Sequence, residues 1–313
     1  MTAVPGKVLL WIYAVVPIIG VVILADHFFF DRSLLAVLPK NPEELLFYAI
    51  IFNIPHVIAS FLSLADADYL RFYGKKLYLG LPILLSAAAV LIYLAPLGAL
   101  IAYIVFTMYH FRMQQAGTAL FFIGKPPRLY MLWVWLSIAT ASILYAAVRH
   151  QSDIASYVPV HSLILSAGFL LVLFFALSYK LFFEIPSRPG RAYFAATASS
   201  IFGAFLFLIF GYPFFVIVAG RIIHDATAML IYAIQAKNRA QVSQSNVLYR
   251  VLGHGNLIFV SFPIFAIGFA FALRSHVGAG ATFFMLLGVS HYYIEGFVWK
   301  RGTIHRDHLP FAV

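Results

Sequence analysis

The sequence contains no cysteine and few charged residues. Of its 313 residues, 10% are Asp, Glu, Lys or Arg, whereas about 25% is usual in soluble domains. The absence of cysteine excludes disulfide bonds, thiolate metal sites and cysteine nucleophiles, so any metal site must use His, Asp, Glu or water. The shortage of charge, together with 63% hydrophobic residues, excludes intrinsic disorder and an ordinary soluble protein. We therefore expect an integral membrane protein.

Apolar runs close to the roughly 20 residues needed to cross the hydrocarbon core recur along the chain. They predict an all-α fold: a polytopic transmembrane helix bundle of about ten spans, forming a single membrane domain over residues 1–313. The predicted spans are 8–25, 43–64, 77–95, 97–122, 128–149, 158–183, 192–211, 212–236, 255–273 and 280–300. The least certain boundary is Gly211-Tyr212-Pro213, because apolar residues continue on both sides of it.

The distribution of basic residues supports this number of spans. With ten spans both termini share one side of the membrane, and only Arg32, Lys40, Arg149 and Arg274 lie on the opposite side. Two further arginines lie within spans, and the other fifteen of the 21 Lys and Arg residues share the side of the termini. Basic loops remain cytoplasmic, so both termini are predicted to be cytoplasmic. The formal net charge of +10 is then explained without a nucleic-acid partner, and none is expected.

Four of the eleven histidines fall inside predicted spans: His56, His110, His224 and His291. With the boundaries above, each lies roughly 11 to 14 residues from the start of an even-numbered span. Even-numbered spans run in the same direction, so the four rings are predicted to share one depth near the midplane. Ionisable groups at that depth normally face the bundle interior, and neutral imidazole is the commonest protein metal ligand. The pattern indicates a shared metal site, with interhelical hydrogen bonding and a proton or substrate pathway as alternatives.

Polar residues accompany these histidines at helical spacing. Glu295 follows His291 by four residues and Gln114 follows His110 by four, so each pair shares a helix face. Carboxylates and amides beside imidazoles fix the ring tautomer and orientation in metal sites. We expect Glu295 and Gln114 to orient the ligands, with direct ligation by Glu295 as an alternative.

Charged residues also lie within the predicted spans. Arg221 and Asp225 are four residues apart on either side of His224, so they can pair and neutralise each other. Arg112 and Asp225 are candidates for stabilising charge or for anchoring a polar headgroup. By contrast, His305 and His308 follow the last span, and a solvated basic tail is expected there, although their spacing could chelate a metal.

A proline is expected to distort the second span. Pro55 precedes His56 inside the predicted helix 43–64. A proline in a helix interior removes a backbone hydrogen bond and clashes with the preceding turn. A kink is therefore predicted just before His56.

The segment Ile-Pro-His-Val-Ile-Ala-Ser around His56, with histidines on several later helices, resembles the Brp/Blh family of membrane β-carotene dioxygenases. This resemblance implies a polytopic protein that binds a non-haem iron through histidines within the bilayer. It implies a ligand role for His56 and, by analogy of placement, for the three other intramembrane histidines. Pro-His-x-x-Ala-Ser, Tyr-His-x-x-x-Gln-Gln and His-Tyr-Tyr-x-x-x-x-x-Trp-Lys also resemble segments of little-characterised bacterial membrane proteins, which favours location in a bacterial inner membrane.

The leading hypothesis is a membrane-embedded non-haem iron oxygenase that uses Fe(II) and O₂ on a lipophilic substrate drawn from the membrane lipids. A histidine-rich site with open coordination positions suits such iron chemistry. The competing hypothesis is a transporter or channel whose intramembrane charges line an aqueous route. A third is a membrane protein that binds haem through two histidines.

Overall fold

The computed structural model describes residues 1–39, 42–45, 48, 51–52, 54–149, 157–243, 246–253, 255–277, 281–300 and 302–312. Lys40 and the side chain of Arg149 lie outside this part of the chain. Almost all of the described residues are helical, which confirms the all-α class. The strands within these ranges are β1 (Val4–Pro5) and β2 (Phe311–Ala312), which form a short parallel pair. The described chain divides into two compact units.

Among the described residues, seven helical segments are long and apolar enough to cross a membrane, as an integral membrane protein requires. These segments are Gly6–Phe29, Ala67–Leu94, Tyr130–Val148, Val160–Glu184, Arg188–Ile209, Pro213–Val242 and Asn256–Ser275. Each overlaps one of the spans expected from the sequence. The boundary expected at Gly211 is confirmed, because one helix ends at Ile209 and the next begins at Pro213. Gly211 turns the chain there with φ +87°, a conformation that favours glycine.

The three remaining predicted spans correspond to helices that are not among these seven. They are α5 (Ile54–Leu64, 11 residues), α8 (Pro96–Ile123, 28 residues) and α16 (Ala281–Val298, 18 residues). The first is short, and the other two carry polar residues that lower their mean hydropathy. These three helices carry His56, His110 and His291.

Unit 1 comprises Met1–Pro5, Leu46–Phe106 and Asp225–Ala312. Besides α5, α16 and the first part of α8, it contains α6 (Ala67–Lys75), η2 (Lys76–Gly80), α7 (Leu81–Leu94), the end of α13 (Pro213–Val242), α14 (Val247–Leu252), α15 (Asn256–Val277) and η3 (Arg306–His308). Ala228, Ala236 and Ala240 lie on one face of α13, in a row that also holds Tyr232, and they pack in one core with α5 and α15. Small side chains allow membrane helices to approach closely, so this row brings α5 and α15 together with α13.

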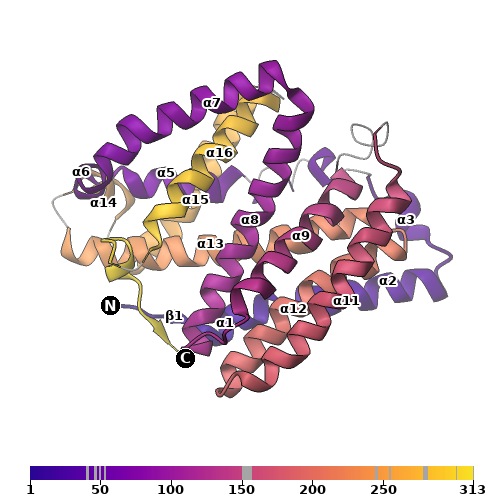
Figure 1. Ribbon diagram of the computed structural model, residues 1–313. Coiled ribbons are helices and arrows are strands. Elements are labelled where there is room, and N and C mark those ends of the chain that lie inside the picture. The colour runs from indigo at the N-terminus through magenta and orange to yellow at the C-terminus, as the bar shows by residue number, and fades with distance from the viewer. Residues whose placement is uncertain are drawn as a thin grey trace. The chain divides into compact units, whose positions relative to one another are not determined.

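Unit 2 comprises Gly6–Leu45 and Thr107–His224. Besides parts of α8 and α13, it contains α1 (Gly6–Ile12), α2 (Val15–Phe29), α3 (Ser33–Val37), η1 (Pro42–Glu44), α9 (Tyr130–Arg149), α11 (Val160–Glu184) and α12 (Arg188–Ile209). Helices α9, α11 and α12 lie side by side (Figure 1). Trp133 is fully buried among them, with ring centroids 5.4 Å from Phe174 and 4.6 Å from Phe194. Its indole Nε1 donates to Ser178 Oγ at 2.8 Å, so its polar group is satisfied within the apolar core.

The kink predicted at Pro55 is replaced by a helix start. Helix α5 begins at Ile54, so Pro55 lies in its first turn. Proline is favoured there because the first turn has no intrahelical partner for its missing N–H. The helix is therefore not distorted by the proline. His56 consequently lies in the first turn of α5, and not 11 to 14 residues from a helix start.

Candidate metal centre

His56 of α5 and His291 of α16 form a buried pair within unit 1. Their ring centroids lie 4.7 Å apart in an edge-to-face arrangement. The two side chains are 2% and 0% exposed. A buried polar ring is costly unless it has partners, and the residues around this pair supply them.

Each histidine of this pair has a carboxylate neighbour. His56 Nδ1 lies 3.1 Å from Asp225 Oδ1, and His291 Nε2 lies 4.0 Å from Glu295 Oε1. Tyr232 donates to the same Glu295 oxygen at 2.6 Å, which holds that carboxylate in place. The structure therefore places Glu295 beside His291, as expected from the spacing, and brings Asp225 to His56, a partner that the sequence did not suggest.

A serine sets the tautomer of His291. Ser60 Oγ donates its only proton to the carbonyl of Val57 at 2.6 Å. The contact of 2.9 Å between Ser60 Oγ and His291 Nδ1 must then use a proton of the ring, so Nδ1–H donates to Ser60. This leaves a lone pair on Nε2 of a neutral His291, which is the form of imidazole that binds metal ions.

His110 of α8 and His224 of α13 form a second buried pair, within unit 2. Their ring centroids lie 4.9 Å apart, again edge to face, and the side chains are 7% and 0% exposed. Phe111 stacks on His224 with centroids 3.9 Å apart and an interplanar angle of 14°. The Arg221 guanidinium lies over the same Phe111 ring, 4.9 Å from its centroid. The aromatic ring therefore fixes both the imidazole and the guanidinium.

The other candidates of unit 2 lie on α8 beside His110. Arg112 is buried and donates to the side chains of Gln115 and Ser137. Gln114 Oε1 is buried and has no hydrogen-bond partner among the described residues, so the structure gives it an unused acceptor. The amide that binds Arg112 is that of Gln115, which the sequence did not single out.

Sequence reasoning also missed a buried polar cluster in unit 1. Arg239 Nε donates to Asp66 Oδ2 at 2.7 Å, and Tyr249 donates to the same oxygen at 3.1 Å. Arg239 also binds Asp68. Burial raises the pKa of Asp66, but Arg239, the Asp68 N–H and Tyr249 together outweigh this effect and hold the pKa below its ordinary value. Because Asp66 and Arg239 are far apart in the sequence, no local sequence pattern predicts their contact.

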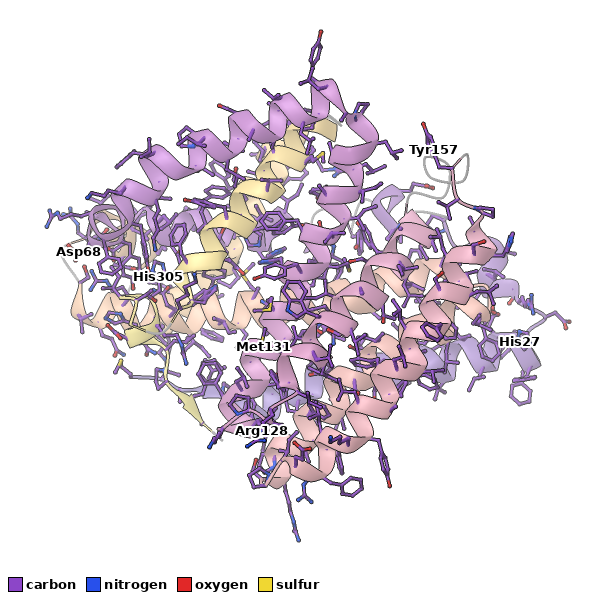
Figure 2. All side chains as sticks on the ribbon, viewed as in Figure 1. His27, Asp68, Arg128, Met131, Tyr157 and His305 are labelled. Carbon is purple, nitrogen blue, oxygen red and sulfur yellow. The ribbon has the colours of Figure 1, made fainter. Side chains whose placement is uncertain are left out.

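The expectation of a solvated tail at His305 is wrong. His305 is fully buried, and its Nε2 lies 3.2 Å from Ser63 Oγ. Its ring stacks near Tyr69, with centroids 3.8 Å apart. Burial lowers the pKa of His305 to about 3, so the ring is neutral. In Figure 2, His305 and Asp68 appear at the same end of unit 1.

Comparison with known proteins provides no relative of this chain. No protein family, no curated protein and no solved structure matches it. The assignment of a function therefore depends on the residues of the two units.

Proposed function

We propose that the protein is a membrane-embedded non-haem iron oxygenase that acts on a lipophilic substrate. The proposed ligands of the metal ion are His56, His110, His224 and His291, four buried side chains whose nitrogens could hold a cation. The observation that carries the proposal is the pairing of buried histidines within each unit. Neutral imidazole donors of this number suit iron and leave open positions for a co-substrate.

Chain connectivity supports the assignment of both pairs to one ion. His224 and Asp225 are consecutive residues of the continuous helix α13, so their Cα atoms are about 3.8 Å apart. His224 belongs to the pair of unit 2, and Asp225 is the carboxylate that contacts His56 in unit 1. One helical turn therefore supplies a ligand from one pair and the carboxylate partner of the other.

The remaining candidates are assigned to positioning roles. Asp225 holds the ring of His56, and Ser60 holds that of His291, which keeps the ligating nitrogens oriented. Glu295 Oε1 lies 4.0 Å from His291 Nε2, where it is available as a direct carboxylate ligand. Gln114, whose Oε1 is unused, is available to orient His110 or a substrate. Fe(II), when bound, would supply the activation of O₂. The four histidines would hold the ion, and the surrounding buried side chains would exclude bulk water from it.

The proposed setting is the inner membrane of a bacterium, with about ten spans and both termini in the cytoplasm. Large apolar side chains are exposed along α7 and α11, including Ile83, Val90, Phe169 and Val172. Such exposure is expected where a helix faces lipid. A lipophilic substrate would enter from this phase. The resemblance to the Brp/Blh family agrees with the proposal.

Metal analysis of the purified protein tests the proposal. We expect about one iron ion per chain after purification in detergent, and His110→Ala should retain less than a tenth of it, because a ligand is removed. His161→Ala is the matched control, since His161 is an exposed histidine of unit 2. A His110→Ala variant with full iron content would contradict the assignment. Wild-type protein without metal would favour transport, and a Soret band would favour haem binding.

A further inference from the structure

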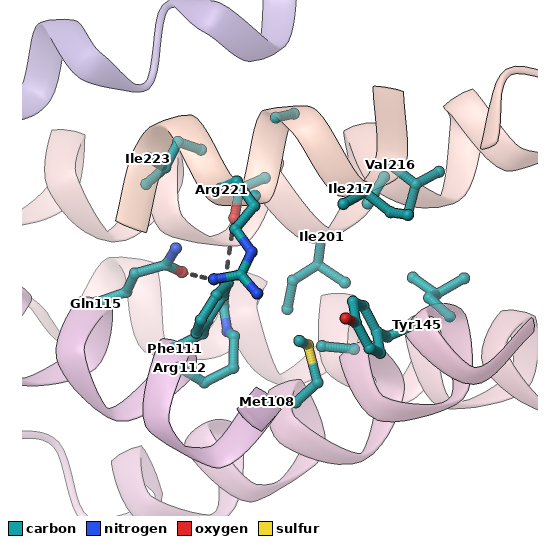
Figure 3. A pocket seen from close by; sticks show the side chains of 16 residues that line it. Met108, Phe111, Arg112, Gln115, Tyr145, Ile201, Val216, Ile217, Arg221 and Ile223 are labelled. Atoms are coloured by element: carbon teal, nitrogen blue, oxygen red, sulfur yellow. Dashed lines mark hydrogen bonds between the residues drawn. The ribbon is translucent and has the colours of Figure 1, made fainter. Parts of the chain in front are cut away.

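Unit 2 contains a pocket between α8, α9, α12 and α13 that is apolar along most of its wall and cationic at one end. Figure 3 shows Arg112, Gln115 and Arg221 together at one end, and Tyr145 and Val216 towards the other. Every residue that lines the pocket belongs to unit 2. The two arginines are 5% and 6% exposed.

The charge of Arg112 is buried without a counter-charge among the described residues. Its Nε donates to Ser137 Oγ at 3.2 Å, and its terminal nitrogens donate to Ser200 Oγ at 3.2 Å, to the Thr197 carbonyl at 3.3 Å and to the Gln115 side chain. All four acceptors are neutral. They satisfy individual N–H groups but leave the net positive charge in place. A buried charge of this kind is costly.

A second guanidinium shares the pocket. Arg221 lines it together with Arg112, and the Phe111 ring holds the Arg221 guanidinium 4.9 Å from its centroid. A wall of low polarity strengthens the attraction between a guanidinium and a bound anion relative to water. Guanidinium groups also match the planar, two-oxygen geometry of carboxylate and phosphate.

We propose that this pocket binds the compact anionic end, a carboxylate or phosphate, of a single-chain lipid. The anion contacts Arg112 and Arg221, and the hydrocarbon chain follows apolar residues such as Met108 and Ile217. Lipid is the source of the anion because the rest of the wall is apolar and would exclude a hydrated inorganic ion. The pocket and the His110–His224 pair share Phe111 as a common wall. Binding of this lipid does not depend on the proposed function. Its identification with the lipophilic substrate rests on that proposed function.

Equilibrium binding of radiolabelled palmitate to metal-free protein in a neutral detergent tests the inference. Palmitate and dodecyl phosphate should compete with each other, whereas methyl palmitate, which lacks the charge, should bind at least tenfold more weakly. Arg112→Gln should weaken palmitate binding about tenfold or more, as expected for the loss of a charge-assisted contact. Arg128→Gln removes an exposed arginine of the same unit and should change the affinity less than twofold.

A second variant tests the pocket without a change of charge. Ala204→Phe places a large ring on the pocket wall and should weaken palmitate binding while both arginines remain. Equal binding of palmitate and methyl palmitate, or unchanged affinity in both variants, would overturn the proposal. Competition by inorganic phosphate as strong as that by palmitate would also overturn it, because the ligand would then be a free anion. The palmitate assay uses metal-free protein, so a negative result would not contradict the proposed iron site. A protein that binds no iron could still be tested for palmitate binding.

Discussion

The two histidine pairs lie in opposite electrostatic surroundings. In unit 1, carboxylates flank His56 and His291, and in unit 2 the chain segments that carry His110 and His224 also carry Arg112 and Arg221. Carboxylates beside imidazoles favour a bound cation, and guanidinium groups favour a bound anion. We propose that the carboxylates of unit 1 strengthen metal binding and that the arginines of unit 2 hold the charged end of a lipid.

Removal of the Asp225 charge is the strongest test of the difference between the two histidine pairs. Asp225→Asn keeps the size of the side chain but removes the charge beside His56. We expect iron affinity to fall about 10- to 100-fold, the usual effect of a lost partner of a ligating histidine. Competition with a chelator measures this affinity. The control is Asp307→Asn, which removes an exposed carboxylate of the same unit.

The same variant shows whether the two surroundings act separately. Asp225→Asn should leave palmitate binding unchanged, and Arg112→Gln should leave iron affinity unchanged. If either variant impaired both ligands to the same degree, the proposed division between the two units would be wrong.

A smaller effect is expected at Ser60, which accepts the Nδ1 proton of His291. Ser60→Ala removes one hydrogen bond, worth roughly 1 kcal/mol, so iron affinity should fall about fivefold. Ser275→Ala is a matched control, because Ser275 makes the same kind of bond to a carbonyl of its own helix, at 2.9 Å from Ala272 O. Equal affinities of Ser60→Ala and the wild type would exclude the tautomer assigned to His291.

The smallest effect concerns pH. His305 is held neutral because burial lowers its pKa to about 3, and Asp66, Arg239 and His308 act on it more weakly. An unfolded His305 gains a proton below about pH 6.5, whereas the folded residue does not. Its contribution to stability is therefore present above pH 6.5 and is lost as the pH falls towards 3.

Melting temperatures between pH 7.5 and 5.5 measure this contribution. The wild type should lose more stability over this range than His305→Gln, by roughly 1 kcal/mol. His27→Gln, in unit 2, controls for the replacement of a histidine by glutamine elsewhere in the protein. Parallel pH profiles for the wild type and His305→Gln would show that the buried histidine does not titrate on unfolding.

Local sequence patterns predicted the helices well but predicted single side-chain environments less reliably. The Gly211-Tyr212-Pro213 segment marked a helix boundary within a nearly continuous apolar stretch, and helical spacing placed Glu295 beside His291. The depth argument does not hold for His56, because α5 starts at Ile54. The bond between Arg112 and Gln115 depends on packing around α8, which spacing alone does not encode.

Long-range contacts explain the rest of the difference. His305 was expected in solvent because it follows the last apolar run, but Ser63 and Tyr73 contact its ring from more than 230 positions away in sequence. Asp225 reaches His56 in the same way, across 169 positions. Such contacts depend on how distant helices pack, and a hydropathy pattern contains no information about the partner of a given residue.

The central claim is that four imidazoles bind one ion, and X-ray absorption at the iron edge tests it most directly. The proposal predicts one iron site per chain with four imidazole nitrogens at about 2 Å. The single variants His56→Ala and His224→Ala, one from each unit, should each remove this site. A spectrum with only two imidazoles, unchanged by one of the two variants, would contradict the claim and show that the two pairs do not share a metal ion.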